Sequence, residues 1–349
     1  MTVQIQNPSN ANEWVDLSST GIENIPVQYG LPSALGLFTP EYGTSSDWYL
    51  PIVDKVGYAL VDTPYNTRSQ NITKDKKKRL KYEIPHFSVE GAIFPSDVKQ
   101  KIAWEDFMFQ SRSETVAGLF DREKETAAQA IQRTKDLAMY QLIRDGSVYA
   151  PNGTVVNNLY TAFGVTQTSL PLDLTPTGNP KVSILTALDD IAANFKGGYV
   201  PSRYVAFTNK AVFDALEAHP LVMDNAKNIL DFQSIQILTG LLGTAAPSGA
   251  SRNQYRAIDY AGVLWIRVSD TEIPANQVRL FPIDVPNMFK ISYAPSELTF
   301  DTVNTTALEQ YYWEKVASDR TQIQYIYESN FAAITPYPKS IVRLNAVYA

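Results

Sequence analysis

Two histidines, His86 and His219, are the only side chains of this 349-residue chain whose ordinary pKa lies close to neutral pH. A Ser-His-Asp site or a multi-histidine metal site would have to use them. Each lies beside a proline, and His219-Pro220 follows a predicted helix. We therefore expect structural roles for both, with a positive charge on His219 favoured by the end of that helix.

Other kinds of reactive site have no support in the sequence. The absence of cysteine excludes disulfides, thiolate metal sites and cysteine nucleophiles. The Walker A, G-x-G-x-x-G, G-x-S-x-G and H-E-x-x-H motifs are all absent. Carboxylates are numerous, but no pair has a spacing that favours a glycosidase site. We expect no catalytic, cofactor-binding or metal site, and a protein that is not an enzyme.

The sequence also lacks signals for export or membrane insertion. The first residues, Met1-Thr2-Val3-Gln4, do not form the basic and apolar regions of a signal peptide. No apolar run approaches the roughly 18 residues that a membrane-spanning helix requires. We expect a protein that is made in a cytoplasm and has no membrane partner.

A short basic stretch is the strongest charge feature. Residues 68–81 carry seven basic residues and one acid, a net charge of +6, although the whole chain has a net charge of −6. The stretch forms a solvated loop, binds nucleic acid, or docks on an acidic neighbouring copy. It lacks interleaved aromatic residues, which weakens the nucleic-acid interpretation. The basic residues are Arg68, Lys74, Lys76, Lys77, Lys78, Arg79 and Lys81.

The flanking segments predict extended elements. Residues 1–48 mix polar residues with apolar ones such as Trp14 and Leu35, without a helical or strand period. They form either an extended arm on another surface or a terminal segment wrapped around their own domain. Apolar segments at 49–53 and 57–61, the basic stretch, and the alternating residues 80–84 predict a long projecting hairpin.

Two helices follow from their periodicity. Residues 111–146 predict a long helix that ends at Gly146, with Ser111 and Glu114 at capping-box spacing. A helix from Asp121 to Asp145 alone would be about 37 Å long. Its predicted buried face contains Ala127, Ile131, Thr134, Ala138 and Leu142. A second amphipathic helix is predicted at 181–195, with Val182, Leu185, Leu188, Ile191 and Ala192 on one face.

Short strands surround these helices. Residues 147–156 predict a hairpin with an Asn-Gly turn. Residues 199–300 predict a separate α/β region, with strands at 204–207, 235–238, 262–268 and 278–281 and a helix at 209–218. Residues 308–349 alternate as strands do, and we expect them to return to a sheet begun earlier. The middle region would then be an insertion.

Four segments, in this order, resemble the major capsid proteins of tailed bacteriophages, in the lambda-type capsid E group. Residues 84–97, Ile84-Pro85-His86 through Ser96-Asp97, resemble the end of that family's hairpin, the E-loop. Residues 127–146 resemble the end of its long spine helix. Residues 218–222, Ala-His-Pro-Leu-Val, resemble a helix end in its A-domain. Residues 308–315, followed by strands, resemble the return into its P-domain.

The resemblance implies an α+β fold of the Hong Kong 97 type. The implied parts are an N-terminal arm at 1–48, the E-loop with flanking strands at 49–100, a P-domain with the spine helix at 101–198, an inserted A-domain at 199–304, and a return to the P-domain at 305–349. The basic residues from Arg68 to Lys81 would then be inter-subunit contacts of the E-loop.

The implied function is that of a shell protein in the virion capsid. Copies of the chain would form hexamers and pentamers around double-stranded DNA, after assembly in the host cytoplasm. The expected partners are other copies, a separate scaffold protein, a portal and a decoration protein. The alternatives are a carbohydrate-active or carbohydrate-binding β-rich protein and another virion part, such as a tail or decoration protein.

Overall fold

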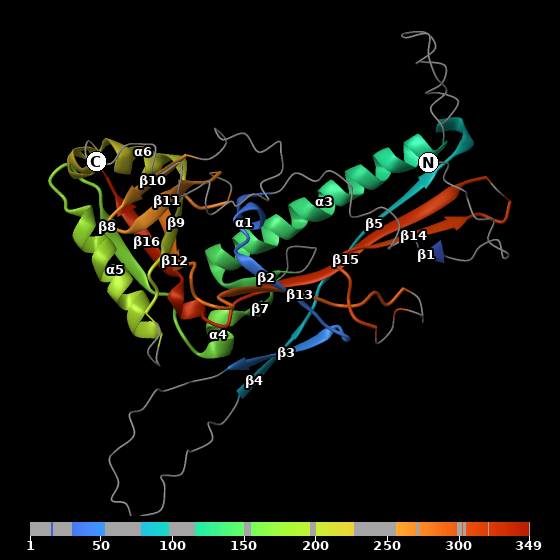
Figure 1. Cartoon of the computed structure of the whole chain (residues 1–349), viewed down its shortest axis with the longest axis horizontal. Helices are drawn as coiled ribbons and strands as arrows, with labels where there is room; N and C mark the ends of the chain where they lie inside the picture. Colours follow the sequence, from blue (N-terminus) through green and yellow to red (C-terminus); the bar gives the residue numbers. More distant parts are fainter. Residues whose placement is uncertain are drawn as a thin grey trace, which may run out of the picture.

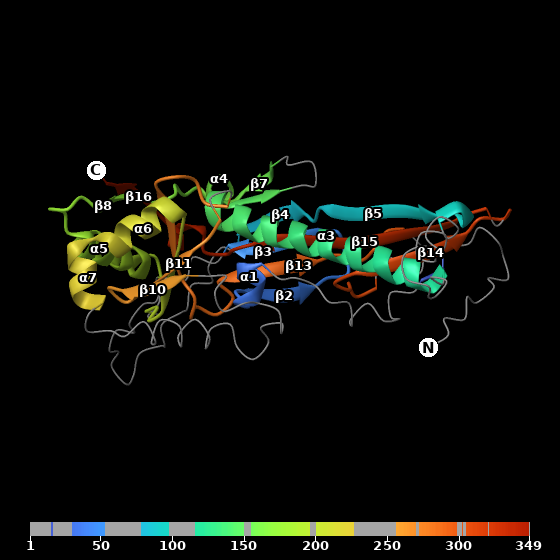
Figure 2. The ribbon, with the colours of Figure 1, turned by 90° about the horizontal axis from the view of Figure 1, so that it is seen from above.

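The computed structural model of the chain describes residues 15–16, 30–52, 78–97, 116–149, 155–195, 200–226, 256–269, 272–298, 302, 305–319 and 321–348. Within these residues, the molecule is elongated and contains two six-stranded sheets (Figures 1 and 2). A long helix runs beside the first sheet, and its C-terminal end meets the second sheet.

The first sheet is organised around β15 (Ile323–Ile334), most of whose residues are buried. β5 (His86–Ile93) pairs antiparallel with β15, and Phe87 stacks on Phe331 with ring centroids 4.5 Å apart. The long helix α3 (Val116–Asp145) packs against β15 and β5 (Figure 1). The other strands of this sheet are β1 (Val15–Asp16), β14 (Tyr311–Val316), β13 (Phe289–Tyr293) and β2 (Phe38–Tyr42).

The second sheet is covered on one face by α5 (Pro180–Asn194) and α6 (Lys210–Ala218), whose buried residues share a core with its strands. α7 (Pro220–Ala226) follows α6 directly. In spatial order, the strands are β10 (Ala257–Tyr260), β11 (Val263–Arg267), β9 (Tyr204–Thr208), β12 (Gln277–Pro282), β16 (Val342–Val347) and β8 (Ser169–Asp173). The predicted strands at 204–207, 262–268 and 278–281 and the helix at 209–218 are confirmed, whereas 235–238 lies outside the described residues.

Residues 308–349 return to sheets begun earlier, as expected, but to two of them: β14 and β15 lie in the first sheet, whereas β16 lies in the second. β16 pairs with β12 and β8 in the second sheet, while β13, from the predicted insertion at 199–304, pairs with β15 in the first. Alternation places Val342, Leu344 and Ala346 on one face, and it cannot reveal which sheet this face covers. The second sheet therefore combines the middle region with strands from either side of it.

α3 confirms the predicted long helix. It ends at Gly146, whose φ of 63° lies in the left-handed region and whose amide donates to the Leu142 carbonyl. Ala127, Ile131 and Leu142 are buried as predicted, and Ala138 packs against the core. The predicted capping residues at 111 and 114 lie outside the described residues. The buried stripe also contains two polar residues that were not predicted there, Gln132 and Asp136.

The predicted face of α5 is wrong in part. Ile191 is buried and Leu188 is partly buried, as predicted, but the core-facing stripe continues through Ile184 and Ala187. Val182 and Leu185 are 59% and 44% exposed. The helix has apolar residues on more than one side, so its periodicity alone did not identify the side that packs on the sheet.

Both predicted hairpins have paired strands. β3 (Asp47–Ile52) pairs with β4 (Lys78–Glu83), and β6 (Ser147–Tyr149) pairs with β7 (Val155–Asn158). The intervening residues, 53–77 and 150–154, lie outside the described residues. The remaining short elements are α1 (Leu31–Ala34), α4 (Leu159–Phe163) and the 3-10 helix η2 (Pro338–Ser340).

Candidate assembly surfaces

The two histidines are integrated in structural hydrogen-bond networks. In the part of the chain that the structure describes, no three acidic, histidine or cysteine side chains are grouped as metal ligands would be. No described helix is long and apolar enough to cross a bilayer. His86 begins β5 in the first sheet, whereas His219 follows α6, which packs on the second sheet. The two histidines therefore do not form a shared site.

His219 connects two helices and a loop. Its side chain is buried, its Nε2 is 3.0 Å from the Thr175 carbonyl, and its Nδ1 accepts a hydrogen bond from the Leu221 amide at 3.3 Å. Burial and these two contacts agree with the structural role expected for His219.

His86 begins β5 and lies beside a buried carboxylate. Its Nδ1 is 2.7 Å from Oδ1 of Asn330 and 3.4 Å from Oε1 of Glu328. Ser296 donates to the other Glu328 oxygen at 2.9 Å. The hydrogen bond with Glu328 is the main cause that raises the pKa of His86. This cluster fixes the start of β5 immediately after the chain leaves the β3–β4 hairpin.

The base of the β3–β4 hairpin is the described part of the predicted basic contact. Lys81 Nζ lies 2.7 Å from Asp47 Oδ2 within the hairpin, and both side chains are largely exposed. Tyr82 is buried, and its hydroxyl is 3.0 Å from the Ser292 hydroxyl of β13. The hairpin is thus anchored on the first sheet by Tyr82. Lys78 and Arg79 lie in β4, while Arg68, Lys74, Lys76 and Lys77 lie outside the described residues.

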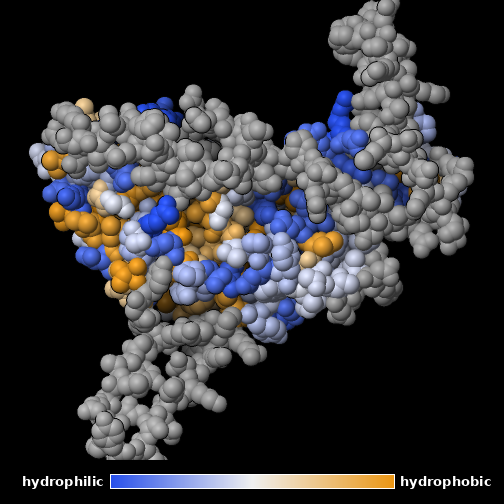
Figure 3. Space-filling model, viewed as in Figure 1, coloured by the Kyte–Doolittle hydropathy of each residue, from blue (hydrophilic) through white to orange (hydrophobic). Residues whose placement is uncertain are grey.

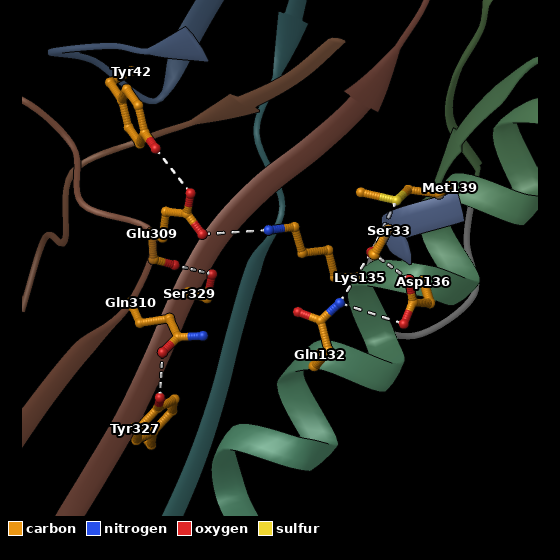
Figure 4. Close-up of polar contacts among 10 residues, drawn as sticks. All are labelled: Ser33, Tyr42, Gln132, Lys135, Asp136, Met139, Glu309, Gln310, Tyr327 and Ser329. Atoms are coloured by element: carbon orange, nitrogen blue, oxygen red, sulfur yellow. Dashed lines mark hydrogen bonds and ion pairs between the residues drawn. The ribbon is translucent and has the colours of Figure 1, made fainter. Parts of the chain in front are cut away.

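A second anchor joins the N-terminal segment to the long helix. Asp136 of α3 accepts hydrogen bonds from the Gly30 amide at 2.8 Å and the Ser33 hydroxyl at 2.5 Å. Gln132, one turn earlier, donates to Ser33 and to Asp136 (Figure 4). Burial raises the pKa of Asp136, and the hydrogen bonds from Ser33 and Gly30 oppose this shift. Asp136 therefore holds α1 in place before β2 enters the first sheet.

Glu309 forms a third connection beside this anchor. It accepts from the Tyr42 hydroxyl at 2.8 Å and lies 3.4 Å from Lys135 Nζ, so it links β2 to α3 (Figure 4). A cavity of about 150 Å³ lies between α1, α3 and the first sheet, with Phe38 and Ile291 in its wall. Local sequence patterns do not indicate the Glu309 contacts, because both partners lie more than a hundred residues away along the chain.

Two helices of the second-sheet unit, α5 and α7, carry exposed apolar residues. Val182 and Leu185 on α5 are 59% and 44% exposed, and Leu221 and Met223 on α7 are 44% and 50% exposed. The His219–Thr175 hydrogen bond ties the start of α7 to the loop before α5. Figure 2 places both helices at the end of the molecule remote from the start of α3, and Figure 3 shows hydrophobic surface at that end. We call these four residues the apolar end patch.

Comparisons with known proteins agree on one class of protein, the phage major capsid proteins. Residues 19–346 match the family model described as phage major capsid protein E. The chain is 26% identical over 356 residues to a major capsid protein of Pseudomonas phage KPP10, covering 97% of this chain and 98% of that protein.

Solved phage capsids have a similar fold. The capsid of Myoviridae phage XM1 aligns with a TM-score of 0.52 and 11% identity, covering 92% of this chain and 94% of the other. The capsid of cyanophage Pam1 aligns with a TM-score of 0.50 and 11% identity, covering 99% of this chain and 98% of the other.

Proposed function

Because the chain belongs to the phage major capsid protein E family, we propose that its copies assemble into hexamers and pentamers of an icosahedral shell around double-stranded DNA. The protein is a major capsid protein, a structural component of the tailed-phage virion, and its α+β fold is of the Hong Kong 97 type. The family match over residues 19–346 carries this conclusion. It does not favour the carbohydrate-binding, tail or decoration alternatives.

The proposed domain assignment follows the two sheets. Residues 1–48 form an arm and 49–100 the E-loop, and these segments add β1, β2 and β5 to the first sheet, which forms the P-domain together with α3. The A-domain is the second sheet, so it takes in β8 and β16 in addition to strands of the 199–304 segment. The anchors at Tyr82 and Asp136 support this proposal, because Tyr82 ties the described part of the E-loop to β13 and Asp136 ties Gly30 to α3.

The E-loop contacts an acidic surface of a neighbouring copy in this proposal. Its seven basic residues lie between Arg68 and Lys81, whereas the rest of the chain has a strongly negative net charge. Lys81 is the exception, because it already pairs with Asp47 in its own hairpin. Exposed ion pairs contribute only about 0–1 kcal/mol each, so the contact depends on repetition around the shell and weakens with salt.

The apolar end patch forms a second contact between copies, within each ring. Exposed apolar side chains at one end of the subunit gain free energy when another copy covers them. Assembly in the host cytoplasm, with a scaffold, a portal and a decoration protein as partners, completes the proposal. No catalytic step is assigned to the chain.

Charge reversal tests the proposed E-loop contact. The double variant Lys76→Glu/Lys77→Glu should lower the yield of shells and capsomers from the purified full-length chain, as measured by sedimentation and negative-stain microscopy. Arg133→Glu/Lys339→Glu makes the same change in net charge at two exposed positions and should assemble normally. Equal yields from the two variants would contradict the contact.

A further inference from the structure

An arginine pair crosses the second sheet where it meets the long helix. Arg279 of β12 lies directly opposite Arg343 of β16 in the antiparallel register, and Ser169 of β8 is the next residue across. Side chains opposite each other share one face of the sheet. This face meets the end of α3, because Arg279 Nε donates to the Arg144 carbonyl at 2.8 Å. Like charges directly opposite each other destabilise a sheet.

The positive charge at this junction is only partly balanced, by Asp145, whose charge raises the pKa of Arg279. Arg279 is only 2% exposed, and no carboxylate of the described residues lies within ion-pair distance of Arg279 or Arg343. The nearby Asp145 already pairs with Arg144, whose Nη2 is 2.8 Å from Oδ2. Burial, followed by the charge of Arg343, lowers the pKa of Arg279 to about 10.

Part of the Arg279 fork is satisfied by neutral groups. Besides the Arg144 carbonyl, Gln277 Oε1 accepts from Nη2 at 2.8 Å and the Val278 carbonyl accepts from Nη1 at 3.4 Å, which leaves one N–H on each terminal nitrogen for a further acceptor. The C-terminal carbonyls of α3 also favour a cation there. Arg343 has fewer hydrogen-bond partners than Arg279. Its Nε donates to the Ser169 hydroxyl at 3.2 Å, and its side chain is partly exposed. Three arginines therefore meet one aspartate at a half-buried junction.

Two buried polar atoms beside the arginines lack hydrogen-bond partners among the described residues. They are the Tyr160 hydroxyl and the Gln167 side-chain nitrogen. Tyr160 is 8% exposed, its ring packs against Gly146 at the end of α3, and the charge of Arg279 acts on its hydroxyl. The Gln167 amide lies beside this hydroxyl and lowers its pKa as a hydrogen-bond donor does, although the pair does not reach good hydrogen-bond geometry. A buried unpaired polar group costs free energy, so such groups mark a place for a further partner.

We propose that Arg279, Arg343, Tyr160 and Gln167 bind a small oxyanion of the phosphate class at this junction. Arginine forks recognise the oxygens of such an ion, and the hydroxyl and amide supply further donors. The ion balances the arginine pair and holds the second sheet against the end of α3. A small free ion fits better than a DNA phosphate, because the burial of Arg279 and Tyr160 excludes a polymer backbone.

Inorganic phosphate is the probe for the test. Titration of the full-length chain at constant ionic strength, followed by calorimetry and 31P NMR, should show one saturable site per chain. Saturating phosphate should raise the thermal midpoint by about 3 °C or more. Arg343→Gln should weaken binding by about tenfold or more and remove that rise. Tyr160→Phe, which removes only a neutral donor, should weaken binding about fivefold.

Arg267→Gln is the matched control, because Arg267 lies in the same sheet on β11 but outside the arginine pair. It should retain binding. An equal midpoint rise in wild type and Arg343→Gln would reveal general exclusion of phosphate from protein surfaces and overturn the proposal. The proposal is also overturned if phosphate shows no saturable binding and Arg343 contributes to stability only in assembled shells. That result would assign the balancing charge to a carboxylate of another copy. A DNA oligonucleotide that competes with phosphate would identify a phosphodiester as the bound source instead.

Discussion

Asp136, in the middle of the long helix, accepts a hydrogen bond at 2.8 Å from the backbone amide of Gly30, 106 positions earlier in the chain. The same carboxylate accepts from Ser33. A buried acid that caps a distant four-residue helix acts as a clamp on the segment that follows the proposed N-terminal arm.

Removing this clamp should destabilise the subunit. Asp136→Ala leaves the Gly30 amide and the Ser33 and Gln132 side chains without their acceptor, and we expect a loss of about 2–3 kcal/mol in urea unfolding. Asp121→Ala, at an exposed position of the same helix, should change stability by less than about 0.5 kcal/mol. A double-mutant cycle with Ser33→Ala should show coupling, and strict additivity would contradict the clamp.

The His86 cluster predicts a pH dependence of stability. The hydrogen bond to Glu328 raises the pKa of His86 above its ordinary value of 6.5. The stabilisation is therefore complete below about pH 6.5 and is lost as the pH rises through the higher folded-state pKa. Thermal midpoints of wild type and His86→Gln, measured from about pH 5.5 to pH 8.5, should differ most at low pH. A constant difference would refute the protonated pair.

Two glycines with similar backbone angles offer a matched pair. Gly146 has φ 63° and a Cβ there would lie 2.2 Å from the Tyr160 ring, whereas Gly164 has φ 65° and open space around it. Gly164→Ala should cost about 1 kcal/mol, the strain of the left-handed backbone. Gly146→Ala should cost about 3 kcal/mol, because a clash is added. Equal losses in chemical denaturation would mean that Tyr160 does not pack on the helix end.

The apolar end patch predicts a variant that folds but does not assemble. Val182→Asp/Leu221→Asp should leave the unfolding midpoint nearly unchanged, because both side chains are already exposed, and should reduce ring formation strongly. Val155→Asp, at a 46% exposed position on β7, is the control and should assemble. Normal rings from the double variant would remove the patch from the interface.

Local patterns predicted much of the fold, and contacts distant in sequence account for what they missed. The period through Ala127, Ile131 and Leu142 and the stop at Gly146 were sufficient for α3. Asp136 has no such signal, since its acceptor role depends on Gly30 far along the chain. The side of α5 was ambiguous because Val182 and Ile184 are both apolar.

The sheet partner of β16 was also beyond local reasoning, because alternation fixes a face but not a neighbour. Likewise, the charges of Arg279 and Arg343 are plain in the sequence, but their direct opposition requires the register of two strands that lie far apart along the chain.

The central claim is that this chain functions as copies packed into a shell. The mass of the purified full-length protein, measured by light scattering and paired with negative-stain microscopy, tests it most directly. We predict rings or closed shells with masses many times that of the 38.9 kDa chain. A stable monomer of that mass under all salt conditions, even with scaffold protein supplied, would contradict the account.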